Sequence, residues 1–121
     1  HKSSHSFPTR RSSDLSNTIR GAVASWAKTL AGELAAHGIT VNNVLPGFTR
    51  TQRLEQIIEE RVAATGKTRA DIEAGMLASV PAARFAEAHE VAAAIAFLAS
   101  PAAGYINGIN MPVDGGRTQS L

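Results

Sequence analysis

The sequence predicts part of an α/β domain, and three observations support this class. Several segments repeat apolar residues at steps of three and four, as in helices that bury one face. Two short runs with β-branched residues predict strands, and the first of them follows a helix through a glycine turn. Parallel sheets are covered by helices on both sides, so two strands are too few to bury their own faces. We therefore expect a piece of a larger α/β domain, with about four helices and two strands.

The first helix is expected over residues 16–37. Its apolar stripe consists of Ile19, Val23, Trp26, Leu30 and Leu34, with alanines beside it. Gly38 follows as the residue that takes a positive φ at the helix end. Residues 39–45 (ITVNNVL) then predict a buried strand, which Pro46 and Gly47 close. A helix, a glycine turn and a buried strand form the second half of a βαβ unit.

The second helix follows a loop at residues 46–51 (PGFTRT). Its apolar face is Leu54, Ile57, Ile58 and Val62, and Gly66 ends it. Thr68 and Asp71 resemble a capping box with Asp in place of the usual Glu. They predict a third helix that extends to about Ser79.

The last helix is expected over residues 87–100, with Val91, Ile95 and Leu98 as its stripe. The short strand expected at residues 109–113 ends at an Asp-Gly-Gly turn, residues 114–116. No internal repeat and no Gly- or Ser-rich linker interrupts this order. The four helices and two strands therefore belong to one domain.

Charge and composition restrict the function classes. The chain has 12 basic and 10 acidic residues, and residues 1–15 alone carry the net charge of +2. The remainder is neutral and lacks a basic stripe with interleaved aromatics, so nucleic-acid binding is disfavoured. No apolar run approaches the roughly 18–20 residues of a membrane span, which predicts a soluble protein. The absence of cysteine excludes disulfides, a thiol nucleophile and Cys-ligated metal, and favours a cytoplasmic location.

Residues 1–15 are expected to be a disordered head, because they are rich in Ser and Arg and have no apolar periodicity. Residues 5–15 (HSFPTRRSSDL) resemble one reading frame of a common sequencing-adapter oligonucleotide. This resemblance predicts that the head is an assembly artefact and that natural sequence begins near residue 16.

Two segments carry a family resemblance: residues 37–47 (HGITVNNVLPG) and residues 84–116. They resemble the short-chain dehydrogenase/reductase family, and most of all its members similar to 3-oxoacyl-carrier-protein reductase. The family's active-site helix begins Tyr-x-x-x-Lys, and a glycine turn and a strand (HGI-x-VN) follow 18 residues after the Lys. Here Gly38 of HGITVNNVLPG lies 18 residues after Arg20. Residues 84–116 (RFAEAHEVAAAIAFLASPAAGYINGINMPVDGG) resemble the family's last helix and strand.

The resemblance implies that residues 16–121 are the C-terminal part of one doubly wound, Rossmann-like parallel-sheet domain, without the N-terminal nucleotide-binding half. It implies an NAD- or NADP-dependent oxidoreductase that transfers hydride between the cofactor and a small carbonyl or alcohol substrate, such as a 3-oxoacyl compound. It also implies a homodimer or homotetramer of the full-length parent. It does not indicate a metal, a membrane or nucleic acid as a partner.

In this register the family's catalytic Tyr is replaced by Ser16 and its Lys by Arg20. A Tyr beside a cation can be tuned as a proton donor, whereas a Ser hydroxyl is far less acidic. Arg20 can hydrogen-bond the ribose of a cofactor but cannot relay a proton near neutral pH. The other interpretations are an N-cap hydroxyl for Ser16 and a solvated charge for Arg20. The replacement also leaves open a catalytically silent dinucleotide-binding relative that acts as a binding or assembly protein.

The loop that begins with Pro46 and Gly47 is assigned to the cofactor by the same resemblance. Backbone groups at Thr49 are expected to bind the nicotinamide carboxamide, and the Thr51 hydroxyl to reach the carboxamide or phosphates. The alternative is a plain Pro-Gly turn with a Thr cap. Residues 52–80 resemble the family's substrate lid. There the side chains expected to line an acyl pocket, or to form an ordinary packing stripe, are Leu54, Ile57, Ile58 and Met76.

Overall fold

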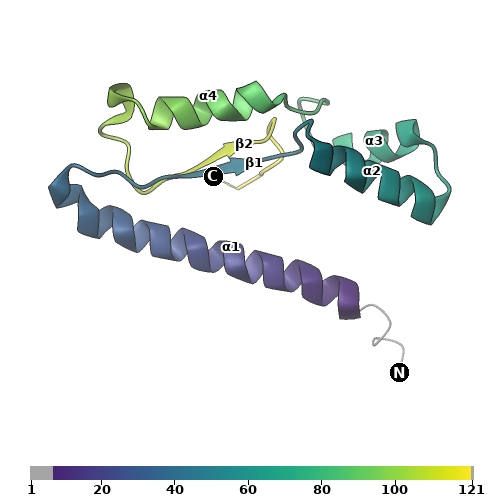
Figure 1. Cartoon of the computed structure of the whole chain (residues 1–121), viewed down its shortest axis with the longest axis horizontal. Helices are drawn as coiled ribbons and strands as arrows, with labels where there is room; N and C mark the ends of the chain where they lie inside the picture. The colour runs from purple at the N-terminus through teal and green to yellow at the C-terminus, as the bar shows by residue number, and fades with distance from the viewer. Residues whose placement is uncertain (1–6, 121) are drawn as a thin grey trace. The chain divides into compact units, whose positions relative to one another are not determined.

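The computed structural model describes residues 7–120, with side chains from Leu15 onward except that of Ser16. The chain divides into two compact units. Unit 1 holds the chain up to Asn43 together with residues 105–109, and unit 2 holds residues 44–104 and 110–121. Figure 1 shows the elements along the chain. The described residues contain the expected four α-helices and two strands, with two short 3-10 turns.

Unit 1 is built on one long helix, α1 (Phe7–Leu34), followed by the 3-10 turn η2 (Ala35–His37). The helix begins at Phe7, so the start expected at Ser16 is wrong, and residues 7–15 are helical where a disordered head was expected. Extending an existing helix costs much less than nucleating one, so a helix with an apolar stripe can continue into a polar segment. Gly38 ends the turn at a φ of 73°, as expected.

The chain after Gly38 is held to the segment 105–109 by side-chain amides. Asn107 donates to the Ala31 carbonyl and accepts from the Val41 N–H, both at 2.9 Å. Asn42 donates to Ile106 O and accepts from Ile109 N, both at 3.1 Å. These bonds use backbone groups that a longer strand would have paired. The first strand, β1 (Asn43–Pro46), is therefore shorter than the expected 39–45.

Unit 2 contains most of the sheet and the remaining helices. The strand β1 pairs with β2 (Asn110–Val113) in a two-stranded sheet. The Asn43 N–H donates to Ile109 O and the Gly47 N–H to Val113 O, each at 2.9 Å, so the register is constant and the strands are parallel. Helix α4 (Ala88–Leu98) packs against β2 and runs beside the strands in Figure 1. The expected parallel α/β arrangement is confirmed in this unit.

Helices α2 (Gln52–Thr65) and α3 (Arg69–Leu77) pack against each other. Each begins at a threonine cap, because the side chains of Thr51 and Thr68 accept from backbone N–H groups at 3.2 and 3.1 Å. Gly66, at a φ of 71°, ends α2 as expected.

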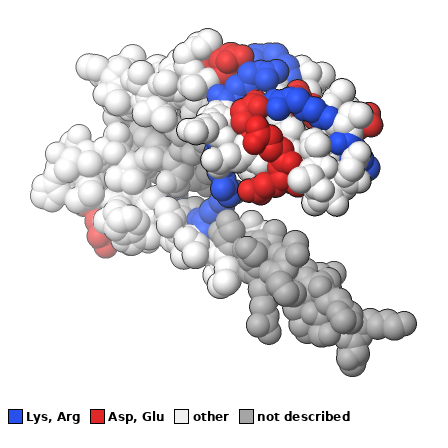
Figure 2. All heavy atoms as spheres, turned by 45° about the vertical axis from the view of Figure 1, so that its right-hand side comes forward, with Lys and Arg blue, Asp and Glu red and all other residues white. Residues whose placement is uncertain are grey.

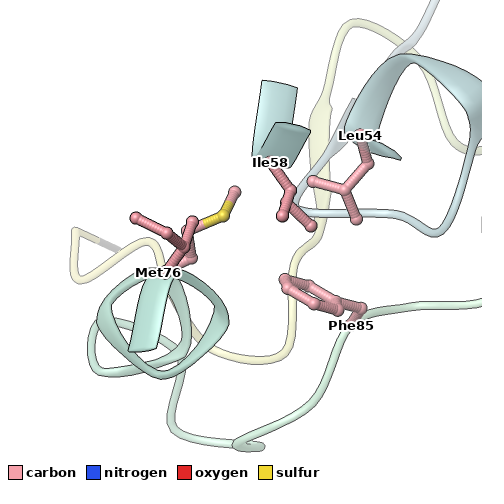
Figure 3. Packing of buried hydrophobic residues seen from close by; sticks show 5 residues of the cluster. Leu54, Ile58, Met76 and Phe85 are labelled. Atoms are coloured by element: carbon pink, nitrogen blue, oxygen red, sulfur yellow. The ribbon is translucent and has the colours of Figure 1, made fainter. Parts of the chain in front are cut away.

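The apolar core of unit 2 lies between these helices and the segment after them. Its buried side chains are Leu54, Ile58, Ile72, Met76 and Phe85. The labelled side chains in Figure 3 point toward one another from α2, from α3 and from the segment that follows α3. Ile58 is the most buried of them, with 1% of its surface exposed. Among residues 7–120, no helix is long and apolar enough to cross a membrane.

Candidate functional site

The loop at the carboxyl end of β1 is held against the exit of β2. Gly47 donates its N–H to Val113 O at 2.9 Å. A Cβ on Gly47 would lie 2.8 Å from both Cα and Cβ of Asp114, so no larger residue fits at this place. Asp114 is itself fixed, because its carboxylate accepts from Gly116 N at 3.0 Å and from Thr118 N at 2.9 Å. The start of the loop is therefore set by close backbone packing.

Thr49 lies in a parallel bridge with Ala86. The two hydrogen bonds of this bridge join Ala86 to the residues before and after Thr49, not to Thr49 itself. Ala86 N donates to Phe48 O at 2.9 Å, and Arg50 N donates to Ala86 O at 2.8 Å. Successive residues of an extended chain direct their N–H and C=O groups to opposite sides, so those of Thr49 face away from Ala86. No described residue bonds to either group. Thr49 thus offers a donor and an acceptor side by side, which is the pattern that a carboxamide requires.

The two threonine hydroxyls of the loop are used locally. Thr49 Oγ1 donates to Gly47 O at 3.0 Å. Thr51 Oγ1 accepts from Leu54 N at 3.2 Å and caps α2. The cap interpretation of Thr51 is therefore confirmed, although its O–H remains able to donate to a ligand. Its expected contact with the carboxamide or phosphates stays a prediction.

Two arginines stack on the aromatic pair of the core. The rings of Phe48 and Phe85 meet edge to face, with centroids 6.3 Å apart. The Arg50 guanidinium lies 5.2 Å from the Phe85 centroid, and that of Arg117 lies 4.6 Å from the Phe48 centroid. Such stacking orients each guanidinium without neutralising it. The loop is therefore flanked by a fixed cation, Arg117, that the sequence did not suggest.

Carboxylates near this loop have lowered pKa values for local reasons. The hydroxyl and backbone N–H of Thr118 and the N–H groups of Gly116 and Arg117 lower the pKa of Asp114. Arg84 donates two hydrogen bonds to Glu90, and these are the main cause that lowers the pKa of Glu90 to about 2. Asp114 stabilises the turn after β2 and Glu90 caps the start of α4, and neither pKa suits a general acid at neutral pH.

Arg20 lies in α1, within unit 1, and its side chain is exposed. No described carboxylate lies within ion-pair distance of it. Ser16 belongs to the same helix, but its side chain is outside the described residues. Positions four apart share one face of a helix, as the Tyr-x-x-x-Lys pattern requires. The catalytic and ribose-binding roles of these two residues stay predictions.

Comparison with known proteins decides the family. The profile of the family described as Enoyl-(Acyl carrier protein) reductase matches residues 3–118. The chain belongs to the short-chain dehydrogenase/reductase family. It is 44% identical over 97 residues to the 3-oxoacyl-[acyl-carrier-protein] reductase FabG of Haemophilus influenzae. The aligned region covers 80% of this chain and 36% of that protein. The chain thus spans about a third of the length of this relative.

Solved structures of the short-chain dehydrogenase/reductase family agree with this assignment. YwfH, an NADPH-dependent reductase of bacilysin biosynthesis, superposes with a TM-score of 0.78 at 35% identity, over 86% of this chain and 39% of its own. A putative 2-deoxy-D-gluconate 3-dehydrogenase from Agrobacterium tumefaciens, with bound NADP, has a TM-score of 0.68 at 35% identity, over 83% and 37%. The family resemblance inferred from the sequence is confirmed.

The side chains expected in the family's substrate lid have mixed positions. Leu54, Ile58 and Met76 are buried in the core of unit 2, and Ile57 is half-buried. This is the packing stripe that was the alternative to an acyl pocket. Met76 and Ile58 also each line a surface pocket, Met76 beside Arg61, Lys67 and Arg117 and Ile58 beside Glu59 and Arg69. Among residues 7–120, no group of three His, Asp or Glu side chains is placed to hold a metal ion.

Proposed function

We propose that the full-length protein carrying this chain is an NAD(P)-dependent oxidoreductase that transfers hydride between the nicotinamide and a carbonyl or alcohol carbon. The observation that supports the proposal best is the unbonded N–H and C=O pair of Thr49 at the carboxyl end of a parallel strand, where open α/β sheets bind ligands. The names of its relatives point the same way, since FabG is a 3-oxoacyl-carrier-protein reductase and YwfH an NADPH-dependent reductase. A 3-oxoacyl compound is the substrate class we propose.

The roles of the chain's own residues follow from this proposal. Pro46 and Gly47 bring the loop to the end of the sheet, and the Thr49 main chain holds the carboxamide so that one face of the nicotinamide ring meets the substrate. The Thr51 hydroxyl donates to the cofactor while its oxygen caps α2. Arg20 holds the ribose hydroxyls. Ser16 occupies the position of the family's proton donor, so we expect slow turnover.

A proline at position 49 tests the backbone contact, because it removes the N–H that would donate to the carboxamide. The loss of one neutral hydrogen bond of about 1 kcal/mol weakens binding about fivefold, and the rigid ring adds to this loss. Gln52→Pro is the matched control, since residue 52 is the first of α2 and proline is tolerated there. Affinity is measured from NADH and NADPH fluorescence with the full-length protein, after circular dichroism has shown that both variants fold.

Weaker binding in Thr49→Pro, with Gln52→Pro like the wild type, supports the proposed contact. Equal binding in all three proteins contradicts it. A wild type that binds neither cofactor refutes the proposed function as a whole. Binding without turnover on 3-oxoacyl, sugar and steroid carbonyls favours the catalytically silent alternative. The cytoplasmic location and the homodimer or homotetramer also stay predictions.

A further inference from the structure

A groove on unit 2 combines an apolar floor with a basic rim. It is open to solvent and has a volume of about 350 Å³, between α3, the end of α2 and the chain after β2. Phe48, Ile72 and Met76 form its apolar floor, and Arg61, Lys67 and Arg117 stand at its rim. We call it the basic groove. Its volume lies within the range of about 300–1,000 Å³ that is usual for small-molecule sites.

The cations of the basic groove lack acidic partners among the described residues, unlike three of the four other cations in unit 2. Three of the seven Lys and Arg side chains in unit 2 form ion pairs with glutamates: Arg50, Arg69 and Arg84. Four have no carboxylate within ion-pair distance among the described residues: Arg53, Arg61, Lys67 and Arg117. Three of these four line the one groove.

Basic and acidic side chains lie next to one another over the α2–α3 part of the molecule in Figure 2. Asp71 is the single described carboxylate that lines the groove. It lies in the first turn of α3, where the helix dipole stabilises a negative charge. The lining groups therefore keep an excess of two positive charges, and this excess favours an anionic ligand.

Arg117 is already oriented for such a ligand. Its Nε donates to Ser79 Oγ at 3.2 Å, and its guanidinium lies on the Phe48 ring. Ser79 is fixed in turn, since its hydroxyl donates to Met76 O at 3.1 Å. The two terminal nitrogens of Arg117 have no partner among the described residues. A guanidinium held in this way can bind an oxyanion through two parallel hydrogen bonds with little loss of entropy.

We propose that the basic groove binds a ligand with an apolar chain of a few carbons and a terminal oxyanion, which Arg117 holds while the chain lies on Phe48, Ile72 and Met76. Phe48 precedes Thr49 in the loop assigned to the cofactor, so the ligand would be an anionic substrate of the same site. Its role as a substrate rests on the proposed function, but its binding does not. A carboxylate and a phosphate monoester share the required chemistry.

The test compares probes that each contain six carbons but differ in the charge of the head group. Hexanoate, hexanamide and hexyl phosphate are titrated into the full-length protein by isothermal titration calorimetry at low salt. We expect the wild type to bind hexanoate or hexyl phosphate at least tenfold more tightly than hexanamide. The tighter of the two anions identifies the oxyanion. The preference should shrink at high salt, because the groove is open to solvent and salt screens exposed charges.

The decisive variants are Arg117→Gln and a matched control, Arg53→Gln. Both remove one unpaired, exposed cation from unit 2, but only residue 117 lines the groove. We expect Arg117→Gln to weaken anion binding about tenfold without affecting hexanamide, and Arg53→Gln to bind as the wild type does. The double variant Arg61→Gln/Lys67→Gln, which leaves the Phe48 stack intact, should also weaken anion binding.

Equal affinity for hexanoate, hexyl phosphate and hexanamide, or the same loss in the Arg53 and Arg117 variants, would overturn the basic-groove proposal. So would the absence of binding by every probe. These results are independent of cofactor binding, which is measured separately on the wild type. If the protein binds the anions but neither NADH nor NADPH, the basic-groove proposal is supported and the proposed function is refuted.

Discussion

Replacing Gly47 by Ala tests whether close backbone packing positions the cofactor loop. The added Cβ would lie 2.8 Å from Asp114 Cα, whereas carbon atoms pack at about 3.5–4.0 Å. The overlap of at least 0.7 Å must be relieved by moving backbone, because Asp114 is tied to Gly116 and Thr118. Overpacking of this kind costs about 1–3 kcal/mol, so we expect a loss of about 2 kcal/mol in the free energy of unfolding.

The assay is urea unfolding of the full-length protein, together with the affinity for NADPH. Gly75→Ala is the control, since a Cβ there meets no atom within 4 Å. In the interior of α3 this change should stabilise by up to about 1 kcal/mol through helix propensity. The two Gly→Ala changes should therefore have opposite signs, and only that at position 47 should weaken NADPH binding by displacing Thr49. A Gly47→Ala protein as stable as the wild type would refute the reasoning.

Three further predictions concern the core, acid stability and catalysis. Ile58→Ala should lower the free energy of unfolding by about 2–5 kcal/mol, because it leaves a cavity at a buried position; a urea midpoint shift below that of Ile58→Val would contradict this. The lowered pKa of Glu90, about 2 against an ordinary 4.5, means that its stabilisation is full above 4.5 and is lost as the pH falls toward 2. Glu90→Gln should thus be less stable than the wild type at pH 6 but not at pH 2, and a constant difference would exclude the Arg84 pair as the cause. Ser16→Tyr combined with Arg20→Lys should raise turnover of a 3-oxoacyl substrate by at least tenfold, whereas Arg20→Lys alone should not.

The elements of unit 2 could be predicted because local rules determine them. Gly66 ends α2 since it accepts a positive φ, and Thr68 begins α3 since its hydroxyl satisfies a free N–H. The start of α1 at Phe7 was not predicted, because residues 7–15 are polar and have no apolar periodicity, and a helix can extend through polar residues. The short β1 depends on Asn107, which lies 66 residues from its partner Val41.

In the candidate site, too, some features depend on residues close together in the sequence and others on residues from distant segments. The Pro-Gly loop and the 18-residue spacing from Arg20 to Gly38 could be predicted, because each involves residues that are near one another in the sequence. That Leu54 and Ile58 are buried in a core depends on Phe85, which approaches from a distant segment. Periodicity identifies an apolar face but not what covers it.

The sequence by itself determined the family, the order of helices and strands, and the replacement of the family's Tyr and Lys by Ser16 and Arg20, since these depend only on residue types and spacing. Only the tertiary structure decided that the Thr49 main chain is unbonded and that Arg117 lies on Phe48 beside two other unpaired cations. The physical reason is that hydrogen-bond direction and charge pairing depend on which distant segments meet. Ala86 forms hydrogen bonds with the residues before and after Thr49, so the Thr49 main chain stays unbonded. The glutamates pair with Arg50, Arg69 and Arg84, so the cations of the basic groove keep their excess of positive charge.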